Sequence, residues 1–168
     1  MPSVNNVTRM LDAKKIPYTA FDTPAEKLGA AETADFLHVP LEIVFKTVVL
    51  IRQQEGGKSV PGTKKPILAV IPGNHVVDLR MAARELDEKK ILLPTEKEAE
   101  QITGLQAGGI SPLALINKGF LVIVDDAAKA HEAIHVSGGQ RGLNIKMPVG
   151  SLMEITNARF GSISVPGE

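Results

Sequence analysis

The chain has 168 residues, a length that suits one domain with a single substantial core. Hydrophobic residues make up 43% and charged residues 23% of the sequence, and the formal net charge is zero, so no global field indicates a polyanionic partner. The absence of cysteine excludes a disulfide scaffold, a cysteine nucleophile and a thiolate metal site.

Apolar periodicity predicts interleaved helices and strands in the first half of the chain. We expect helices at 5–13 and 29–37, strands at 18–21, 44–51 and 66–71, and a short turn at 40–43. Between the last two strands, residues 53–65 are polar and rich in glycine, so they are predicted to form the loop at a hairpin tip.

Capping residues mark helix boundaries in the second half. Asp78 is the expected N-cap of a helix at 79–86, and Thr95 with Glu98 fits a capping box for a helix that Gly104 closes. The remaining elements are strands at 91–93, 120–124, 134–137, 143–147 and 160–165, a helical turn at 129–133 and a helix at 149–155. These elements alternate too irregularly for a doubly wound sheet, so we predict a mixed α/β, α+β-like fold with residues 1–168 as a single domain.

The beginning of the chain shows no basic region followed by an apolar stretch, as a secretory signal would. No apolar run approaches the roughly 20 residues needed to cross a bilayer. We therefore expect a cytoplasmic protein without a membrane partner. The oligomeric state stays open at this point.

Lys46 is the most informative residue, because it interrupts a run of apolar and β-branched residues from Val44 to Ile51. A lysine in such a run either extends its ammonium to solvent or faces a polar cavity. The first alternative is an ordinary lysine of an edge strand. The second is a lysine that binds an anion or a carbonyl oxygen of a substrate.

Two glycine pairs follow later in the chain. Bare amides in such segments allow a ligand to approach closely and can stabilise an oxyanion. Arg141, after the second pair, has the chemistry to bind a phosphate or a carboxylate. Each segment taken alone is better interpreted as an ordinary turn. The candidate residues in the first segment are Gly108, Gly109, Ile110, Ser111 and Pro112, and those in the second are Ser137, Gly138, Gly139 and Arg141.

Other kinds of chemistry lack support in the sequence. The histidines do not combine with other ligands at the spacing of a known metal motif. Neither Ser111 nor Ser137 lies in the setting of a serine-hydrolase nucleophile. Asp125 and Asp126 end a strand, where a helix cap is the more frequent use of a carboxylate. No metal or cofactor is therefore expected.

Taken together and in this order, three segments resemble the YbaK family of Cys-tRNA(Pro) deacylases: Val44 to Thr47, Thr103 to Pro112, and Val136 to Leu143. That family is similar to the editing domain inserted in bacterial prolyl-tRNA synthetases. The resemblance implies a central, barrel-like mixed sheet flanked by helices, and hydrolysis of the ester between a wrong amino acid and the 3′ adenosine of tRNA. It implies that Lys46 is needed for catalysis, with Thr47 and the two glycine segments binding the substrate.

The resemblance also implies the partners, which are aminoacyl-tRNA, through the acceptor end of tRNA(Pro), and prolyl-tRNA synthetase. This sequence departs from the family at Leu105, Ala114 and Asn144, where many relatives have an aromatic residue, a glycine and an acidic residue. Two alternatives therefore stay open. One is a deacylase for another acyl group, such as that of Ala-tRNA(Pro). The other is a non-catalytic module that binds an amino acid or aminoacyl-tRNA and docks on a synthetase.

Overall fold

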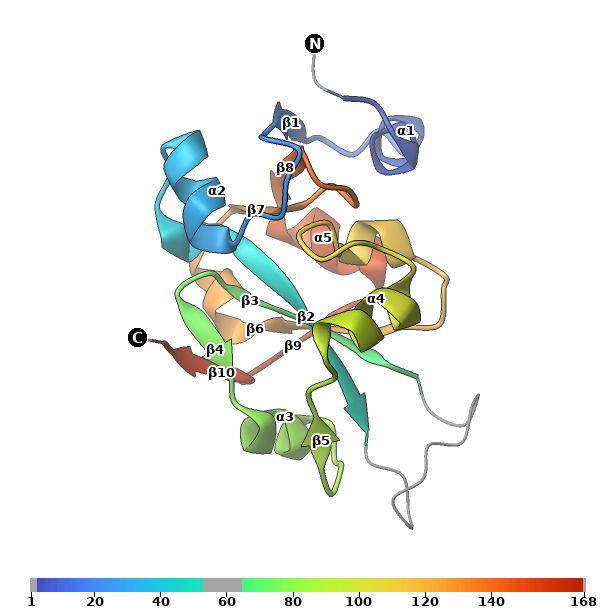
Figure 1. The fold of residues 1–168 in the computed structure, drawn as a ribbon, viewed down its shortest axis with the longest axis vertical. Helices are drawn as coiled ribbons and strands as arrows, with labels where there is room; N and C mark the ends of the chain where they lie inside the picture. Colours follow the sequence, from blue (N-terminus) through green and yellow to red (C-terminus); the bar gives the residue numbers. More distant parts are fainter. Residues whose placement is uncertain (1–2, 53–64, 168) are drawn as a thin grey trace.

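The computed structural model describes residues 3–52 and 65–167, so most of the predicted loop at 53–65 lies outside the described residues. A five-stranded sheet crosses the middle of the molecule in the order β5–β2–β3–β6–β9 (Figure 1). Its strands are β2 (Phe45–Arg52), β3 (Ile67–Pro72), β5 (Ile91–Leu92), β6 (Leu121–Asp125) and β9 (Arg159–Gly161). β2 is antiparallel to β3 and β5, whereas β6 is parallel to β3 and β9. The predicted mixed α/β class is therefore confirmed.

Two smaller antiparallel sheets accompany the central one. The first contains β1 (Thr19–Asp22), β8 (Leu143–Pro148) and β7 (Ala133–Ser137) in that order, and the second pairs β4 (His75–Val77) with β10 (Ser164–Pro166). A single parallel bridge between Val44 and His135 connects the start of β2 to β7. Among the described strands, the central sheet stays open with β5 and β9 at its edges, so the barrel-like sheet that the resemblance implied does not form a closed barrel.

The helices form where the capping residues predict them. Asp78 accepts hydrogen bonds from the first amides of α3, Thr95 and Glu98 form the capping box of α4, and Gly104 ends α4 with a φ of 71°. The helices are α1 (Asn6–Ala13), α2 (Ala30–Leu37), α3 (Leu79–Glu85), α4 (Glu96–Thr103) and α5 (Val149–Thr156), with 3-10 turns η1 (Leu41–Ile43), η3 (Pro112–Leu115) and η4 (Asp126–Ala130). Within the described ranges, no helix has the length and apolarity to cross a membrane.

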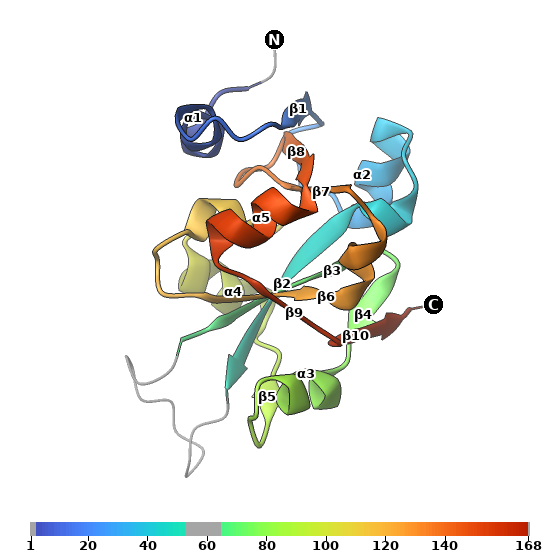
Figure 2. The same cartoon turned by 180° about the vertical axis from the view of Figure 1, so that it is seen from behind.

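The central sheet is buried on both faces, and β3 shows this most clearly, because all its residues are buried. Successive side chains of a strand point to opposite faces. Leu68 and Val70 pack with α1, α5, β7 and β8, while Ala69 and Ile71 pack with α3. Figure 2 shows α5 and the β1–β8–β7 sheet on one side of the central sheet and α3 on the other.

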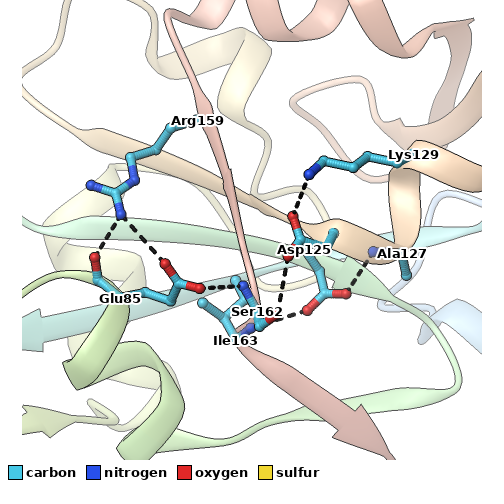
Figure 3. A network of polar contacts seen from close by, with 8 residues as sticks. Glu85, Asp125, Ala127, Lys129, Arg159, Ser162 and Ile163 are labelled. Atoms are coloured by element: carbon cyan, nitrogen blue, oxygen red, sulfur yellow. Dashed lines mark hydrogen bonds and ion pairs between the residues drawn. The ribbon is translucent and has the colours of Figure 1, made fainter.

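The C-terminal segment differs from the prediction, since residues 160–165 form parts of two short strands instead of one. Backbone amides between β9 and β10 donate to side chains: Ser162 N–H to Glu85 Oε1 at 2.8 Å, and Ile163 N–H to Asp125 Oδ1 at 3.2 Å (Figure 3). Because these amides donate to side chains, they do not continue the backbone pairing of β9 with β6. β10 then turns away to pair with β4, a strand of three residues that the sequence pattern did not predict.

η4 also lies a few residues before the predicted turn at 129–133. Asp125 explains the shift, because its Oδ2 accepts the N–H of Ala127 at 2.9 Å and starts the turn there. The predicted use of this carboxylate as a cap is confirmed.

Candidate functional site

A cavity of about 560 Å³ lies along one edge of β2. β2 pairs with β3 over residues 45–50, but with β5 only at Ile51 and Arg52, so within the described residues its second edge is unpaired over most of its length. Residues 44–49 line the cavity. The other walls come from the segments 23–33, which includes the start of α2, and 93–99, from residues 107, 108 and 110, and from Ser137 and residues 142–144.

Lys46 contributes a cation to this cavity wall. Its Nζ atom donates to the carbonyl oxygen of Gly73 at 3.3 Å, and the side chain is half-buried. Burial lowers the pKa of Lys46, because desolvation disfavours the ammonium form. Across residues 3–52 and 65–167, Lys46 has no ion pair. Its ammonium therefore keeps donors for an anionic group or a carbonyl oxygen of a ligand.

The carbonyl that Lys46 contacts belongs to Gly73, which lies in the turn between β3 and β4. A Cβ atom at this position would lie 2.6 Å from Leu41 Cδ1 and 2.7 Å from both Ala30 Cβ and the Val44 carbonyl oxygen. Only glycine fits so close to its neighbours. The sequence pattern marked this position as a break between strands, but gave no signal that it contacts Lys46.

The first glycine segment divides between the cavity and the loop behind it. Gly108, with a φ of 89°, and Ile110 line the cavity. The amide N–H groups of these two residues make no hydrogen bond with any other described residue. In contrast, Gly109 N–H donates to the Gln106 carbonyl at 2.8 Å, and a Cβ at Gly109 would lie 2.9 Å from the Gln140 backbone.

Ser111 and Pro112 support the loop and do not line the cavity. Ser111 is fully buried, and its Oγ accepts the N–H of Leu113 at 3.1 Å to cap η3. Pro112 is the first residue of η3, a position that suits a residue without an N–H.

The second glycine segment is mainly a packing turn. Ser137 lines the cavity, and its Oγ accepts the N–H of Gly139 at 3.2 Å. A Cβ at Gly138 would lie 2.5 Å from the Leu143 side chain. Arg141 Nε donates to the Ala107 carbonyl at 2.7 Å, which ties this turn to the first glycine segment. Gly138, Gly139 and Arg141 thus lie behind the wall that Ser137 forms.

The structure therefore brings Lys46, Thr47, Gly108, Ile110 and Ser137 together around one cavity. Sequence reasoning missed most of the wall formed by residues 23–33 and 93–99. There the Lys27 ammonium lies 2.5 Å from Glu96 Oε2, linking the segment before α2 to the start of α4. Both side chains are about half exposed, and such ion pairs contribute little to stability.

The three positions that depart from the family pattern have different environments. Leu105 and Ala114 pack against the hydrophobic core. Asn144 lines the cavity, and its Oδ1 lies 2.8 Å from Nδ1 of the fully buried His135. Of the three, Asn144 is therefore the one that changes the chemistry of the cavity wall.

A serine, a histidine and an aspartate also meet away from the cavity, but not as a nucleophilic triad. Ser164 Oγ donates to Asp125 Oδ1 at 2.8 Å, so it accepts from His75 Nδ1, which is also 2.8 Å away. In a triad the histidine lies between the serine and the aspartate and accepts the serine proton. Among the described residues, no cluster of histidine and carboxylate side chains could hold a metal ion.

Comparisons with known proteins match this architecture. A family model described as an aminoacyl-tRNA editing domain matches residues 25–155, which include Lys46 and both glycine segments. The chain is 31% identical to EbsC of Enterococcus faecalis over 161 residues, covering 95% of this chain and 92% of the relative. EbsC is provisionally named as a Cys-tRNA(Pro)/Cys-tRNA(Cys) deacylase.

Two solved structures share the fold. Hypothetical protein APE2540 superimposes with a TM-score of 0.82 at 20% identity, covering 96% of this chain and all of that chain. A second structure, described as a candidate trans-editing enzyme for prolyl-tRNA synthetase, has a TM-score of 0.74 at 19% identity and covers 97% and 99% of the two chains. At these identities the matches establish the fold.

Proposed function

The chain belongs to the aminoacyl-tRNA editing domain family, and we propose that it is a trans-editing hydrolase that removes cysteine from tRNA(Pro). An editing domain hydrolyses the ester of an aminoacyl-tRNA, so the chain is an aminoacyl-tRNA deacylase. The name of the relative EbsC supports cysteine as the acyl group and tRNA(Pro) as one of two carriers, the other being tRNA(Cys). In this proposal residues 1–168 act as one editing domain in the cytoplasm, with prolyl-tRNA synthetase as a partner.

Lys46 carries the proposal, because its ammonium lies in the cavity wall without a carboxylate partner in the described part of the chain. An aminoacyl ester is already activated towards hydrolysis, so positioning and electrostatic stabilisation suffice to accelerate the reaction. In this account Lys46 orients the ester carbonyl or the terminal ribose and phosphate. Thr47 and Ser137 complete the binding wall around it.

The amides of Gly108 and Ile110 receive the negative charge that develops on the carbonyl oxygen. Both residues line the cavity, and neither N–H is used by another described residue. Loss of one such donor typically reduces the rate by about 100-fold or more. Gly109, Ser111, Pro112, Gly138 and Gly139 act in this proposal by holding the two loops in shape.

The chain contains no cysteine, and its sequence does not indicate a serine-hydrolase triad, so in this proposal the nucleophile comes from the substrate or from water. With a cysteinyl substrate, the thiol attacks the ester carbonyl and forms the carbon–sulfur bond of a small thiolactone ring. The carbon–oxygen bond to the tRNA breaks, and the thiol proton passes to the ribose oxygen. Water then opens the ring to give free cysteine.

Arg141 binds a phosphate of the acceptor end in this proposal. Its Nε is used by the Ala107 carbonyl, and the terminal guanidinium nitrogens make no hydrogen bond within the described residues. Replacing a phosphate-binding arginine weakens binding and reduces its dependence on salt. We expect Arg141→Ala to have both effects on tRNA affinity, and an unchanged salt dependence would contradict this role.

A panel of charged tRNAs tests the proposed function. Loss of the ester is measured for Cys-tRNA(Pro), Ala-tRNA(Pro), Pro-tRNA(Pro) and Cys-tRNA(Cys), each corrected for spontaneous hydrolysis. We expect Cys-tRNA(Pro) to be deacylated and Pro-tRNA(Pro) to stay intact. Selective loss of Ala-tRNA(Pro) would overturn the acyl preference, and binding without loss of any ester would identify a non-catalytic module. Cys-tRNA(Cys) shows whether the tRNA body is read.

A further inference from the structure

We propose that His135 is a positioning residue, which fixes the carboxamide of Asn144 so that its N–H donors face the cavity and bind an oxygen acceptor of the substrate. The acceptor is an oxygen of the aminoacyl ester or of the terminal ribose, so this inference rests on the proposed function. No part of it requires His135 itself to touch the substrate.

The pairing of β7 with β8 places the two residues on the same face. Ser137 lies opposite Asn144, and His135 lies opposite Lys146. Opposed residues of an antiparallel pair share a face, as do residues two apart along a strand. The other face of these strands belongs to the hydrophobic core and carries Ile134, Val136, Leu143, Ile145 and Met147. Ser137 and Asn144 therefore point to the cavity side, with His135 beneath them.

The hydrogen bond between the two side chains has a defined direction. His135 Nδ1 lies 2.8 Å from Asn144 Oδ1, and an amide oxygen only accepts, so Nδ1 carries the proton. Burial lowers the pKa of His135, with a further contribution from the charge of Lys146, while the bond to Asn144 opposes the shift. The ring is therefore neutral near pH 7, and its proton stays on Nδ1.

Among the described residues, the hydrogen bond to Asn144 is the one polar contact of the His135 ring. The side chain is fully buried, the Phe21 ring lies 5.5 Å away, and Nε2 has no hydrogen-bond partner in the described part of the chain. Since a buried polar atom without a partner is costly, an apolar residue would serve packing better. The imidazole contributes one specific interaction, which is its bond to Asn144.

This bond determines what Asn144 offers to a ligand. With Oδ1 occupied by His135, the free group is the Nδ2 amide, which makes no hydrogen bond with another described residue. Asn144 therefore presents hydrogen-bond donors to the cavity, as Lys46 does from β2. The carboxylates of the cavity come from other elements: Glu26, Glu32 and Glu96. An oxygen acceptor fits the Asn144 wall, whereas the substrate ammonium does not.

A double-mutant cycle on Cys-tRNA(Pro) deacylation tests this role. We expect His135→Phe, which keeps a ring beside Phe21 but removes the Nδ1 donor, to lower kcat/KM by about 10-fold, the value of one lost hydrogen bond. His135→Asn places an amide donor near the Nδ1 position and should restore kcat/KM to within about threefold of wild type. In an Asn144→Ala background, His135→Phe should cause no further loss.

A further loss in the Asn144→Ala background, or full activity of His135→Phe alone, would overturn the proposal. Val136→Ala is the matched control, since Val136 neighbours His135 on β7 but points to the opposite face. Its kcat/KM per folded molecule should equal that of wild type. A changed value would mean that any alteration of β7 disturbs the cavity, which would overturn a specific role for His135.

Nitrogen-15 NMR of the wild-type imidazole provides a test that needs neither a variant nor a substrate. We expect a neutral ring with the proton on Nδ1 at pH 7. A ring protonated on Nε2 would overturn the proposal, because Asn144 would then turn its oxygen to the cavity. If wild type deacylates no tRNA of the panel, the proposed function fails while the NMR result still reports on the His135–Asn144 bond.

Discussion

The Lys46 ammonium is held 3.3 Å from the carbonyl oxygen of Gly73, at the end of β2 that lines the cavity. Lys46 lies opposite Ile71, near the end of β3. This pairing places Gly73, in the turn that follows β3, next to the Lys46 side chain. An ammonium has three N–H donors, and this contact uses one of them. The backbone therefore orients the cation and leaves donors for the substrate.

Gly73→Ala should disturb this arrangement. The added methyl would lie within 2.7 Å of Leu41, Ala30 and the Val44 carbonyl, so we expect the free energy of unfolding in urea to fall by about 1–3 kcal/mol. Gly150→Ala in α5 is the control, because a Cβ there has open space and a helix prefers alanine. Equal stability of the two variants would contradict the close packing at Gly73.

The pH dependence of deacylation should report the protonation of Lys46. In the proposed function the active form of Lys46 is the cation, and burial lowers the pKa of Lys46 below its ordinary value of 10.5. As pH rises, kcat/KM corrected for spontaneous hydrolysis should therefore fall with a midpoint below 10.5. A Lys46→Arg enzyme with residual activity should lack this alkaline decrease, since arginine stays charged. A profile without the decrease in wild type would contradict the role of the cation.

His135 should make stability sensitive to mild acid. Folding lowers the pKa of His135 from its ordinary value of 6.5. The stability that the neutral ring contributes is therefore fully present above pH 6.5 and is lost as the pH falls towards the pKa of the folded state. Between about pH 7.5 and pH 5.5, wild type should lose up to about 1 kcal/mol more unfolding free energy than His135→Phe does. Parallel losses in the two proteins, measured by urea denaturation, would show that His135 titrates normally.

The carboxylate of Asp125 should stabilise the C-terminal segment. It accepts three hydrogen bonds, from the backbone amides of Ala127 and Ile163 and from the Ser164 hydroxyl. Asp125→Asn replaces one acceptor oxygen with an N–H donor that faces other donors. We therefore expect the free energy of unfolding to fall by about 1.5–3 kcal/mol. Asp126→Asn is the control, because Asp126 is partly exposed and should cost less than about 1 kcal/mol. Similar costs at both positions would contradict the role of Asp125.

The secondary structure could be predicted wherever local chemistry determines it. Asp78, Thr95 and Gly104 mark helix boundaries because capping involves neighbours within a few residues. The C-terminal strand was predicted incorrectly because its break depends on Asp125 and Glu85, which lie far away in the sequence. The barrel-like closure came from the resemblance, and the open edges at β5 and β9 reflect strand pairing that no local pattern encodes.

The candidate site could be predicted only in part, for a similar reason. Lys46 stands out because a charge in an apolar strand is costly. A glycine pair, however, gives the same pattern whether its residues line a cavity, as Gly108 does, or pack against the interior, as Gly138 does. The bond between His135 and Asn144 joins residues nine positions apart through strand pairing, so periodicity alone cannot reveal it.

In the proposed function, Lys46 is the residue that makes this cavity an editing site. The most direct test compares deacylation of Cys-tRNA(Pro) by wild type and Lys46→Met under single-turnover conditions, with urea denaturation to verify folding. We expect Lys46→Met to lose at least about 100-fold in rate, with stability equal to or above that of wild type because a half-buried charge is removed. A folded Lys46→Met protein that deacylates Cys-tRNA(Pro) at the wild-type rate would contradict this role of Lys46.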